Sequence, residues 1–253
     1  MPIALTRDVS SRFGECELTH LARVPIDIDL ARLQHRRYEE ALQDAGLSVE
    51  HLAAGPEMPD SVFVEDIAVV FDELAIVTRP GAASRRAETS AVAAALACHR
   101  SIHTIQAPGT VDGGDVLVAG RRVFVGRSTR TNDAAVAQAR QMLSPFGYTV
   151  CAVDVTGCLH LKSAVTALAD NLLLANPAWI DRAAFVGFEL VEVDPLEPMA
   201  ANALRLDDRV IYPTAFPRSA ERIARRGLRL ELIDASELAK AEGAVTCCSL
   251  IIR

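Results

Sequence analysis

One pattern recurs along the chain and restricts its fold more than any other feature: an apolar strand, a polar turn, a second strand, a helix and a third strand. Four two-strand hairpins are recognisable, with turns at residues 72–73, 120–121, 170–171 and 207–208. Expected helix starts carry N-capping side chains, and expected helix ends carry a glycine. These residues are Asp29, Ser84, Asn132 and Ser219 at the starts, and Gly46, Gly147, Gly187 and Gly227 at the ends.

The first module of this series lacks one strand of its hairpin. Its helix, about residues 29–45, and its last strand are present, and the C-terminal run 248–252 would supply the missing strand by pairing with residues 3–5. Such pairing would close the modules into a ring and remove exposed sheet edges. We therefore expect a single α/β domain over residues 1–253. An open α/β sandwich with accidental regularity is the alternative.

Residues at the start of the first strand of each module should meet at one end of the central pore, because that strand lies nearest the axis. This phase selects Glu65 and Asp66, then Asp112, His160 and Cys247. Taken alone, a histidine between leucines is more often a core residue, and an aspartate in a glycine-rich segment is more often a turn former. Covalent chemistry by a thiol needs an acid–base group and a group that orients it. Cys247 is therefore the candidate nucleophile.

Six short segments carry a resemblance to a known family. They are residues 59–66 (PDSVFVED), 79–86 (RPGAASRR), 112–115 (DGGD), 130–132 (RTN), 159–162 (LHLK) and 246–249 (TCCS). In this order, and over nearly the whole chain, they closely resemble dimethylarginine dimethylaminohydrolase. The resemblance implies the five-fold pseudosymmetric α/β propeller (pentein) of the guanidine-modifying superfamily, in agreement with the closed ring that the periodicity indicates.

The resemblance also implies roles for individual residues. Cys247 matches the nucleophile, His160 the general acid and base, and Asp112 the carboxylate that orients the histidine, a position where some members have glutamate. The implied substrate contacts are Leu18, Asp60, Glu65, Asp66, Arg85, Arg130 and Ala241.

The implied substrate is a methylated arginine, which has a cationic guanidinium at one end and a zwitterionic head at the other. Glu65 and Asp66 would accept hydrogen bonds from the guanidinium, and Asp60 would face the α-ammonium. Arg85 and Arg130 would supply forked donors for the α-carboxylate.

In the implied reaction the Cys247 thiolate attacks the guanidinium carbon and His160 protonates the departing alkylamine. The histidine then activates water against the covalent thiouronium, and citrulline leaves. We expect no metal and no organic cofactor, because the cationic substrate and the protonated histidine can both stabilise the thiolate.

Two rival functions remain open. One is an arginine deiminase or an amidinotransferase of the same superfamily, although those chains are usually longer and carry insertions. The other is a binding protein, since the eukaryotic ribosome anti-association factor shares this ring architecture. The joint presence of Cys247, His160 and the carboxylates disfavours the binding protein.

Composition restricts the partners. A formal net charge of −7 and a pI near 5.4 argue against nucleic acid and against an anionic membrane surface. The chain has no apolar run of about 18 residues and no signal-like start, so we expect a cytoplasmic protein. Its six cysteines show no metal-site spacing, and most of them are expected to be buried thiols. The expected partner is a small-molecule substrate, and the expected state is a monomer or homodimer.

Overall fold

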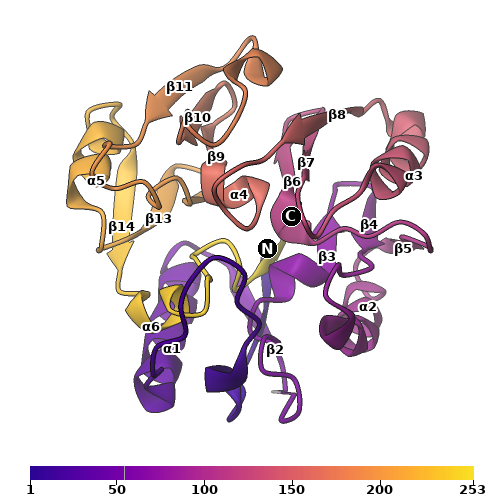
Figure 1. Cartoon of the computed structure of the whole chain (residues 1–253), viewed down its shortest axis with the longest axis horizontal. Coiled ribbons are helices and arrows are strands. Elements are labelled where there is room, and N and C mark those ends of the chain that lie inside the picture. The colour runs from indigo at the N-terminus through magenta and orange to yellow at the C-terminus, as the bar shows by residue number, and fades with distance from the viewer. Residues whose placement is uncertain (54) are drawn as a thin grey trace.

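The computed structural model describes residues 1–53 and 55–253. Its strands form five sheets of three strands each, one for each module. In every sheet the inner strand pairs antiparallel with the middle strand, and the middle strand pairs parallel with the outer one. The sheets surround a central axis, and the long helices lie on the outside (Figure 1). The predicted propeller is therefore confirmed, as five separate sheets instead of one continuous barrel.

The modules are numbered in chain order, and each begins with its inner strand. Module 1 contains β15 (Leu250–Ile252), β1 (Ile3–Arg7), α1 (Ile28–Asp44) and β2 (Ser48–Leu52). Module 2 contains β3 (Ala68–Val70), β4 (Leu74–Val77), α2 (Thr89–Leu96) and β5 (Ser101–Thr104). Module 3 contains β6 (Val116–Ala119), β7 (Arg122–Arg127), α3 (Asp133–Leu143) and β8 (Thr149–Asp154).

Module 4 contains β9 (Val165–Ala169), β10 (Leu172–Ala175), the 3₁₀ helix η6 (Arg182–Phe185) and β11 (Glu189–Glu192). Module 5 contains β12 (Leu204–Leu206), β13 (Arg209–Pro213), α5 (Pro217–Ala224) and β14 (Arg229–Ile233). The short helices α4 (Leu161–Ala164) and α6 (Ser236–Ala239) precede β9 and follow β14. The other 3₁₀ helices are η1 (Phe13–Glu15), η2 (Val64–Ile67), η3 (Ala83–Glu88), η4 (Gly113–Asp115) and η5 (Ser144–Phe146).

The local signals for helix ends were more reliable than those for helix starts. The four predicted glycines all have positive φ, where a residue without Cβ meets no steric penalty. Asn132 caps α3 as predicted, by accepting the Ala135 N–H. Asp27, not Asp29, caps α1. Ser84 lies inside η3, and Ser219 lies inside α5, which starts at a proline whose φ suits the first helical turn.

Module 4 departs from the predicted pattern, because η6 stands where the other modules have an α-helix. The segment between β10 and β11 spans only residues 176–188 and contains Pro177. Asp181 accepts the Ala183 N–H at 2.9 Å and closes a single tight turn. A segment of this length turns back to the parallel outer strand without room for several α-helical turns.

The two ends of the chain pair as predicted. Ile3 faces Ile252, and Leu5 faces Leu250, in an antiparallel register. The closing strand was expected to begin at Cys248, but β15 begins at Leu250 because residues 245–248 form turns. Both termini therefore lie near the axis (Figure 1).

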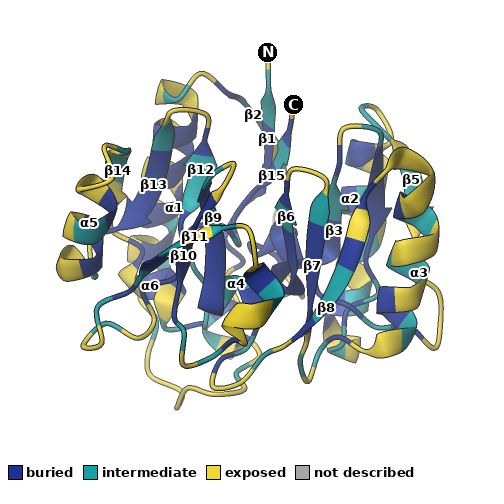
Figure 2. Ribbon diagram, turned by 90° about the horizontal axis from the view of Figure 1, so that it is seen from above, coloured by how far each residue is buried: buried dark blue, intermediate teal, exposed yellow. Residues whose placement is uncertain are grey.

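The buried apolar side chains form five clusters, and each cluster packs one module against the next. The cluster between modules 5 and 1, for example, joins Leu42 of α1 to Ile233 of β14. Figure 2 shows the buried strands on the inside and the exposed helix faces outside. In residues 1–53 and 55–253, no helix combines the length and apolarity needed to cross a bilayer.

Candidate active site

Four candidate catalytic or binding side chains stand just before the inner strands of different modules. Asp66 lies in η2 before β3, and Asp112 directly precedes η4 and β6. His160 precedes α4 and β9, and Cys247 lies three residues before β15. Because the inner strands begin at the same end of the axis, all four side chains line one cavity.

The cavity wall contains eight of the ten site residues that the sequence analysis named: Asp60, Asp66, Arg85, Asp112, Arg130, His160, Ala241 and Cys247. Glu17, Phe63, Leu159, Glu242 and Gly243 complete it. The other two named residues are not among these lining residues. Leu18 packs against the cluster between modules 5 and 1, and Glu65 lines a second cavity.

His160 is buried between two carboxylates. Its Nε2 lies 3.1 Å from Asp112 Oδ2, and its Nδ1 lies 3.7 Å from Asp66 Oδ1. Burial lowers the pKa of His160, but the charge of Asp66 and the hydrogen bond to Asp112 outweigh it and raise the pKa to about 9. The imidazole is therefore protonated at neutral pH and holds a proton that it can donate.

The turn of η4 fits closely around this histidine. A Cβ added at Gly114 would lie 2.5 Å from His160 Nδ1, so only glycine leaves room for the ring. Asp115 accepts the Leu161 N–H at 2.9 Å and holds the start of α4. Asp112 is held in turn by the Gly81 N–H, which donates to Oδ1 at 2.8 Å.

The thiol of Cys247 is half-buried and surrounded by negative charge. Burial, followed by the charges of Glu65 and Asp66, raises the pKa of this thiol well above its usual range. Among the described residues, no hydrogen bond joins Cys247 Sγ to His160, although both side chains line the cavity. The thiol is therefore neutral at neutral pH, and a cation beside it would lower its pKa.

Cys248 occupies a different environment. It is fully buried, packs in the cluster between modules 5 and 1, and is not among the residues that line the cavity. This separation was predicted from the alternation of a β-strand, but the two cysteines lie in a turn before β15. The two thiols are separated as expected, but the geometry of that turn separates them and not the alternation of a strand.

The cavity wall contains a cationic group and an anionic group that are available to a ligand, Arg130 and Asp60. Arg130 donates from Nη2 to Thr19 Oγ1 at 3.0 Å, and its guanidinium lines the cavity. Asp60 accepts the Glu17 N–H at 3.2 Å. Burial raises the pKa of Asp60 to about 6, against the opposing charge of Arg85.

Arg85 is held by protein groups more completely than its expected role as a carboxylate clamp suggests. Its Nε and Nη2 donate to the two oxygens of Glu88 at 3.1 and 2.9 Å. Its Nη1 donates to Asp66 Oδ2 at 2.5 Å. Nη2 also donates to the carbonyls of Asp60 and Phe63. The fork therefore faces Glu88, and Arg85 fixes Asp66 beside the histidine.

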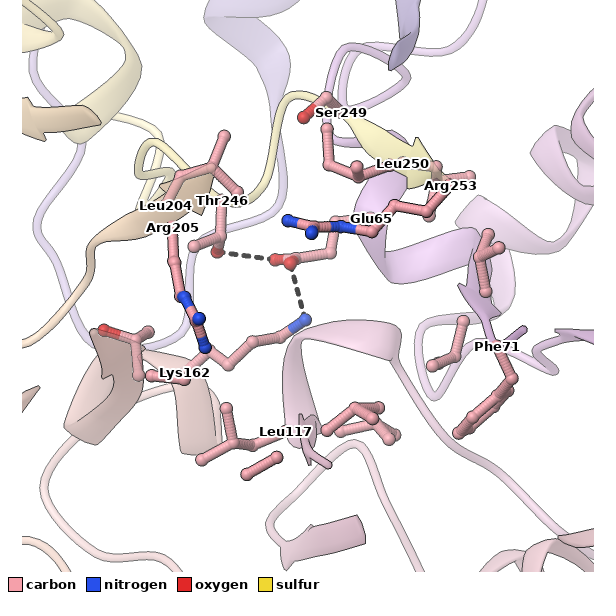
Figure 3. Close-up of a pocket in the computed structure, with 18 of the residues that line it drawn as sticks. Glu65, Phe71, Leu117, Lys162, Leu204, Arg205, Thr246, Ser249, Leu250 and Arg253 are labelled. Atoms are coloured by element: carbon pink, nitrogen blue, oxygen red, sulfur yellow. Dashed lines mark hydrogen bonds and ion pairs between the residues drawn. The ribbon is translucent and has the colours of Figure 1, made fainter. Parts of the chain in front are cut away.

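Glu65 lies beneath the site rather than in its wall. Its carboxylate accepts Lys162 Nζ at 2.5 Å and Thr246 Oγ1 at 2.7 Å (Figure 3). On this side lies a larger cavity of about 560 Å³, lined by the inner strands of all five modules. Glu65, Lys162 and Thr246 thus line the end of the larger cavity that lies nearest to the active site.

Carboxylates and imidazole are metal ligands, and ligand atoms of Asp66, Asp112 and His160 lie within 4.8 Å of one another. Both carboxylates already accept hydrogen bonds, from Arg85, Gly114 and Gly81. Together with the raised pKa of the histidine, these bonds suit a protonated imidazole better than a bound metal ion.

Sequence reasoning missed several residues that hold the site in place: Glu88, Asp115, Lys162, Asn202 and Thr246. Four of them had local signals. Glu88 lies three residues after Arg85, a spacing at which helical side chains pair. Asp115, Lys162 and Thr246 lie in the DGGD, LHLK and TCCS segments.

Comparison with known proteins places the chain in a family. The family described as "N,N dimethylarginine dimethylhydrolase, eukaryotic" matches residues 22–186. An N(G),N(G)-dimethylarginine dimethylaminohydrolase from Streptomyces coelicolor is 42% identical, over 99% of this chain and 96% of that one. The protein of the same name from Pseudomonas aeruginosa is 37% identical, over 86% of each chain.

Solved structures give the same result. A cysteine-to-serine mutant of the Pseudomonas aeruginosa enzyme, complexed with citrulline, superimposes with a TM-score of 0.94 at 34% identity and covers 98% of both chains. The N-terminal domain of ArgZ, an arginine dihydrolase from cyanobacteria, superimposes with a TM-score of 0.90 at 17% identity, covering 100% of this chain and 97% of that one, and shares the fold. The chain belongs to the dimethylarginine dimethylaminohydrolase family.

Proposed function

We propose that this enzyme hydrolyses Nω-methylated L-arginine, as asymmetric dimethylarginine or monomethylarginine, to L-citrulline and an alkylamine. One observation carries the proposal: a thiol, an imidazole, carboxylates and a guanidinium from different modules line a single cavity. The names of the relatives and the citrulline complex of the Pseudomonas enzyme support the same reaction.

The charges along the cavity support one orientation of the substrate. Asp66 lies beside His160 and would accept hydrogen bonds from the guanidinium. Asp60 would face the α-ammonium, and Arg130 would bind the α-carboxylate. Arg85 would act mainly by holding Asp66, since most of its donors are already used.

The first half of the reaction forms the covalent intermediate. The bound guanidinium cation offsets the carboxylate charges and lowers the pKa of the Cys247 thiol. The thiolate attacks the guanidinium carbon, and the bond to the dimethylamine breaks as His160 donates its proton to that nitrogen. The thiol proton leaves to solvent when the cation binds, and His160 is left neutral once it has given its own proton to the amine.

The second half releases citrulline. A water molecule gives a proton to neutral His160 and its hydroxyl to the thiouronium carbon. The carbon–sulfur bond then breaks, the sulfur recovers a proton, and the oxygen stays on citrulline. Asp112 contacts the imidazole and would orient it through both halves.

Substrate entry requires movement of a loop. The cavity has a volume of about 20 Å³, too small for an arginine side chain. The Glu242 carboxylate accepts the N–H groups of Thr19, His20 and Leu21 and holds their loop beside the cavity. Amide exchange at residues 19–21 should slow when citrulline binds, and exchange that citrulline leaves unchanged would contradict this expectation.

The test is citrulline production by purified protein supplied with asymmetric dimethylarginine, monomethylarginine or arginine. Turnover of the methylated substrates, with a Cys247→Ser protein prepared in parallel as the blank, supports the proposal. Preference for arginine would instead identify a deiminase. Dialysis against a chelator should leave turnover unchanged, because the proposed steps use no metal and no organic cofactor.

We also propose a cytoplasmic enzyme that acts as a monomer or homodimer, with the methylated amino acid as its partner. All six cysteines are free, which supports a reducing compartment. Light scattering during gel filtration would decide between the two assembly states and would exclude both if it gave a larger particle.

A further inference from the structure

Module 5 carries an amide at the position where other modules carry candidate catalytic or binding side chains. Asn202 lies two residues before β12, as Asp66 lies two residues before β3. It is 5% exposed and lies outside the cavity wall. Asn202 therefore occupies the repeat position that brings side chains to the active site in other modules, but its side chain does not line the space where a substrate would bind.

All three of its hydrogen bonds go to segments that carry proposed catalytic residues. Asn202 Nδ2 donates to the Lys162 carbonyl at 3.0 Å and to Thr246 Oγ1 at 2.9 Å. Its Oδ1 accepts the backbone N–H of Thr246 at 3.1 Å. Lys162 follows His160 by two residues, and Thr246 directly precedes Cys247.

These bonds are part of a closed ring of contacts. Thr246 Oγ1 donates to one oxygen of Glu65, and Lys162 Nζ donates to the other (Figure 3). The Glu65 N–H donates to the Cys247 carbonyl at 3.1 Å. The amide of Asn202 completes the ring by joining Lys162 to Thr246. The segments that carry the nucleophile and the histidine are therefore linked on the side of the larger cavity.

We infer that Asn202 is a positioning residue, which sets the Cys247 backbone relative to the His160 segment. The inference rests on the proposed function, because it concerns the alignment of those two groups. An amide suits the position since it donates two hydrogen bonds and accepts a third. An ionised carboxylate of the same shape accepts only, and it would face a carbonyl oxygen.

The experiment is to measure steady-state kinetics and melting temperature for Asn202→Asp with asymmetric dimethylarginine. We expect kcat to fall at least about tenfold, because small misplacements of reacting groups are costly. KM should change by less than about twofold, because the residue does not line the substrate cavity. A kcat within about twofold of wild type would overturn the inference.

Asn176→Asp is the matched control. Asn176 is 6% exposed and also donates from Nδ2 to a carbonyl, that of Pro198, while its Oδ1 accepts the Ala178 N–H. This variant should lose melting temperature yet keep the wild-type kcat. Equal loss of kcat in both variants at equal loss of melting temperature would show a merely structural role and overturn the inference.

A second pair covers the case in which Asn202→Asp does not fold. Thr246→Val removes the hydroxyl that Asn202 and Glu65 share and should lower kcat. Thr246→Ser keeps this hydroxyl and should have most of the wild-type kcat. Equal kcat for Val and Ser would overturn the inference. A wild-type protein that makes no citrulline would refute the proposed function itself, which separates the two failures.

Discussion

Two adjacent cysteines differ only in their surroundings. Cys247 lines the cavity, whereas Cys248 is fully buried among apolar side chains. Cys247→Ser should abolish citrulline formation. Cys248→Ser should stay active and lose about 1 kcal/mol of unfolding free energy, as core changes commonly do. Peptide mapping after iodoacetamide treatment should find the substrate-protected label on Cys247, and a protected label on Cys248 would refute the assignment.

The charge of His160 links stability to pH. Its folded pKa is raised to about 9, although burial alone would lower it, and the unfolded value is 6.5. The folded state holds the proton more tightly, so this contribution is complete below pH 6.5 and is lost as pH rises through about 9. The difference in unfolding free energy between wild type and His160→Gln should shrink by roughly 1 to 3 kcal/mol across this range. Urea denaturation measures it, and a constant difference would contradict the assignment.

The two cavity arginines should respond differently to substitution. Arg130→Ala should mainly raise KM, because a carboxylate clamp far from the reacting carbon binds ground state and transition state alike. Arg85→Ala should also lower kcat, because it removes the partner of Asp66 and leaves Glu88 buried without its cation. Initial-rate kinetics on both variants tests this. Equal KM effects with unchanged kcat would place Arg85 in the clamp after all.

At the scale of elements, the short helical turns before the inner strands position the site. The turn of η4 brings Gly114 so close to His160 that an added methyl group would push the ring away. Gly114→Ala should therefore lower kcat at least about tenfold. Gly14→Ala is the control, because nothing lies within 4 Å of a Cβ at that position. Similar kcat values for the two variants would show that the histidine tolerates displacement.

At the scale of the whole molecule, closure of the ring connects stability to activity. Leu250 lies in the closing strand, 4% exposed, within the cluster that packs module 1 against module 2. Leu250→Ala should cost about 2–5 kcal/mol of unfolding free energy. The exposed Leu232, at 51%, is the control, and its replacement by alanine should cost no more than about 0.5 kcal/mol.

Chemical denaturation would measure the unfolding free energy of both leucine variants. Because every cluster spans two modules, we propose that residues 1–253 form one domain that unfolds in a single transition. Two separated transitions would refute the single domain. Equal losses for the two leucine variants would show that the closing strand adds no particular stability.

The repeat could be read from the chain because it depends on local chemistry. Alternating strands, polar turns and helix-ending glycines act over a few residues, and repetition places equivalent positions at equivalent points of a ring. This is why the phase of the inner strands predicted that Asp66, Asp112, His160 and Cys247 would share one cavity. Ring closure followed from the missing strand of module 1, and the C-terminal strand pairs with β1 as predicted.

The partners of the charged side chains depended on the tertiary structure. Nothing local indicates that Glu65 turns to Lys162, which lies 97 residues away, or that Asn202 joins Lys162 to Thr246. Likewise Arg85 lines the cavity, but the buried carboxylates of Glu88 and Asp66 accept hydrogen bonds from its fork. A long side chain has several rotamers of similar energy, and a buried charge selects among them by the opposite charges that distant segments bring within reach.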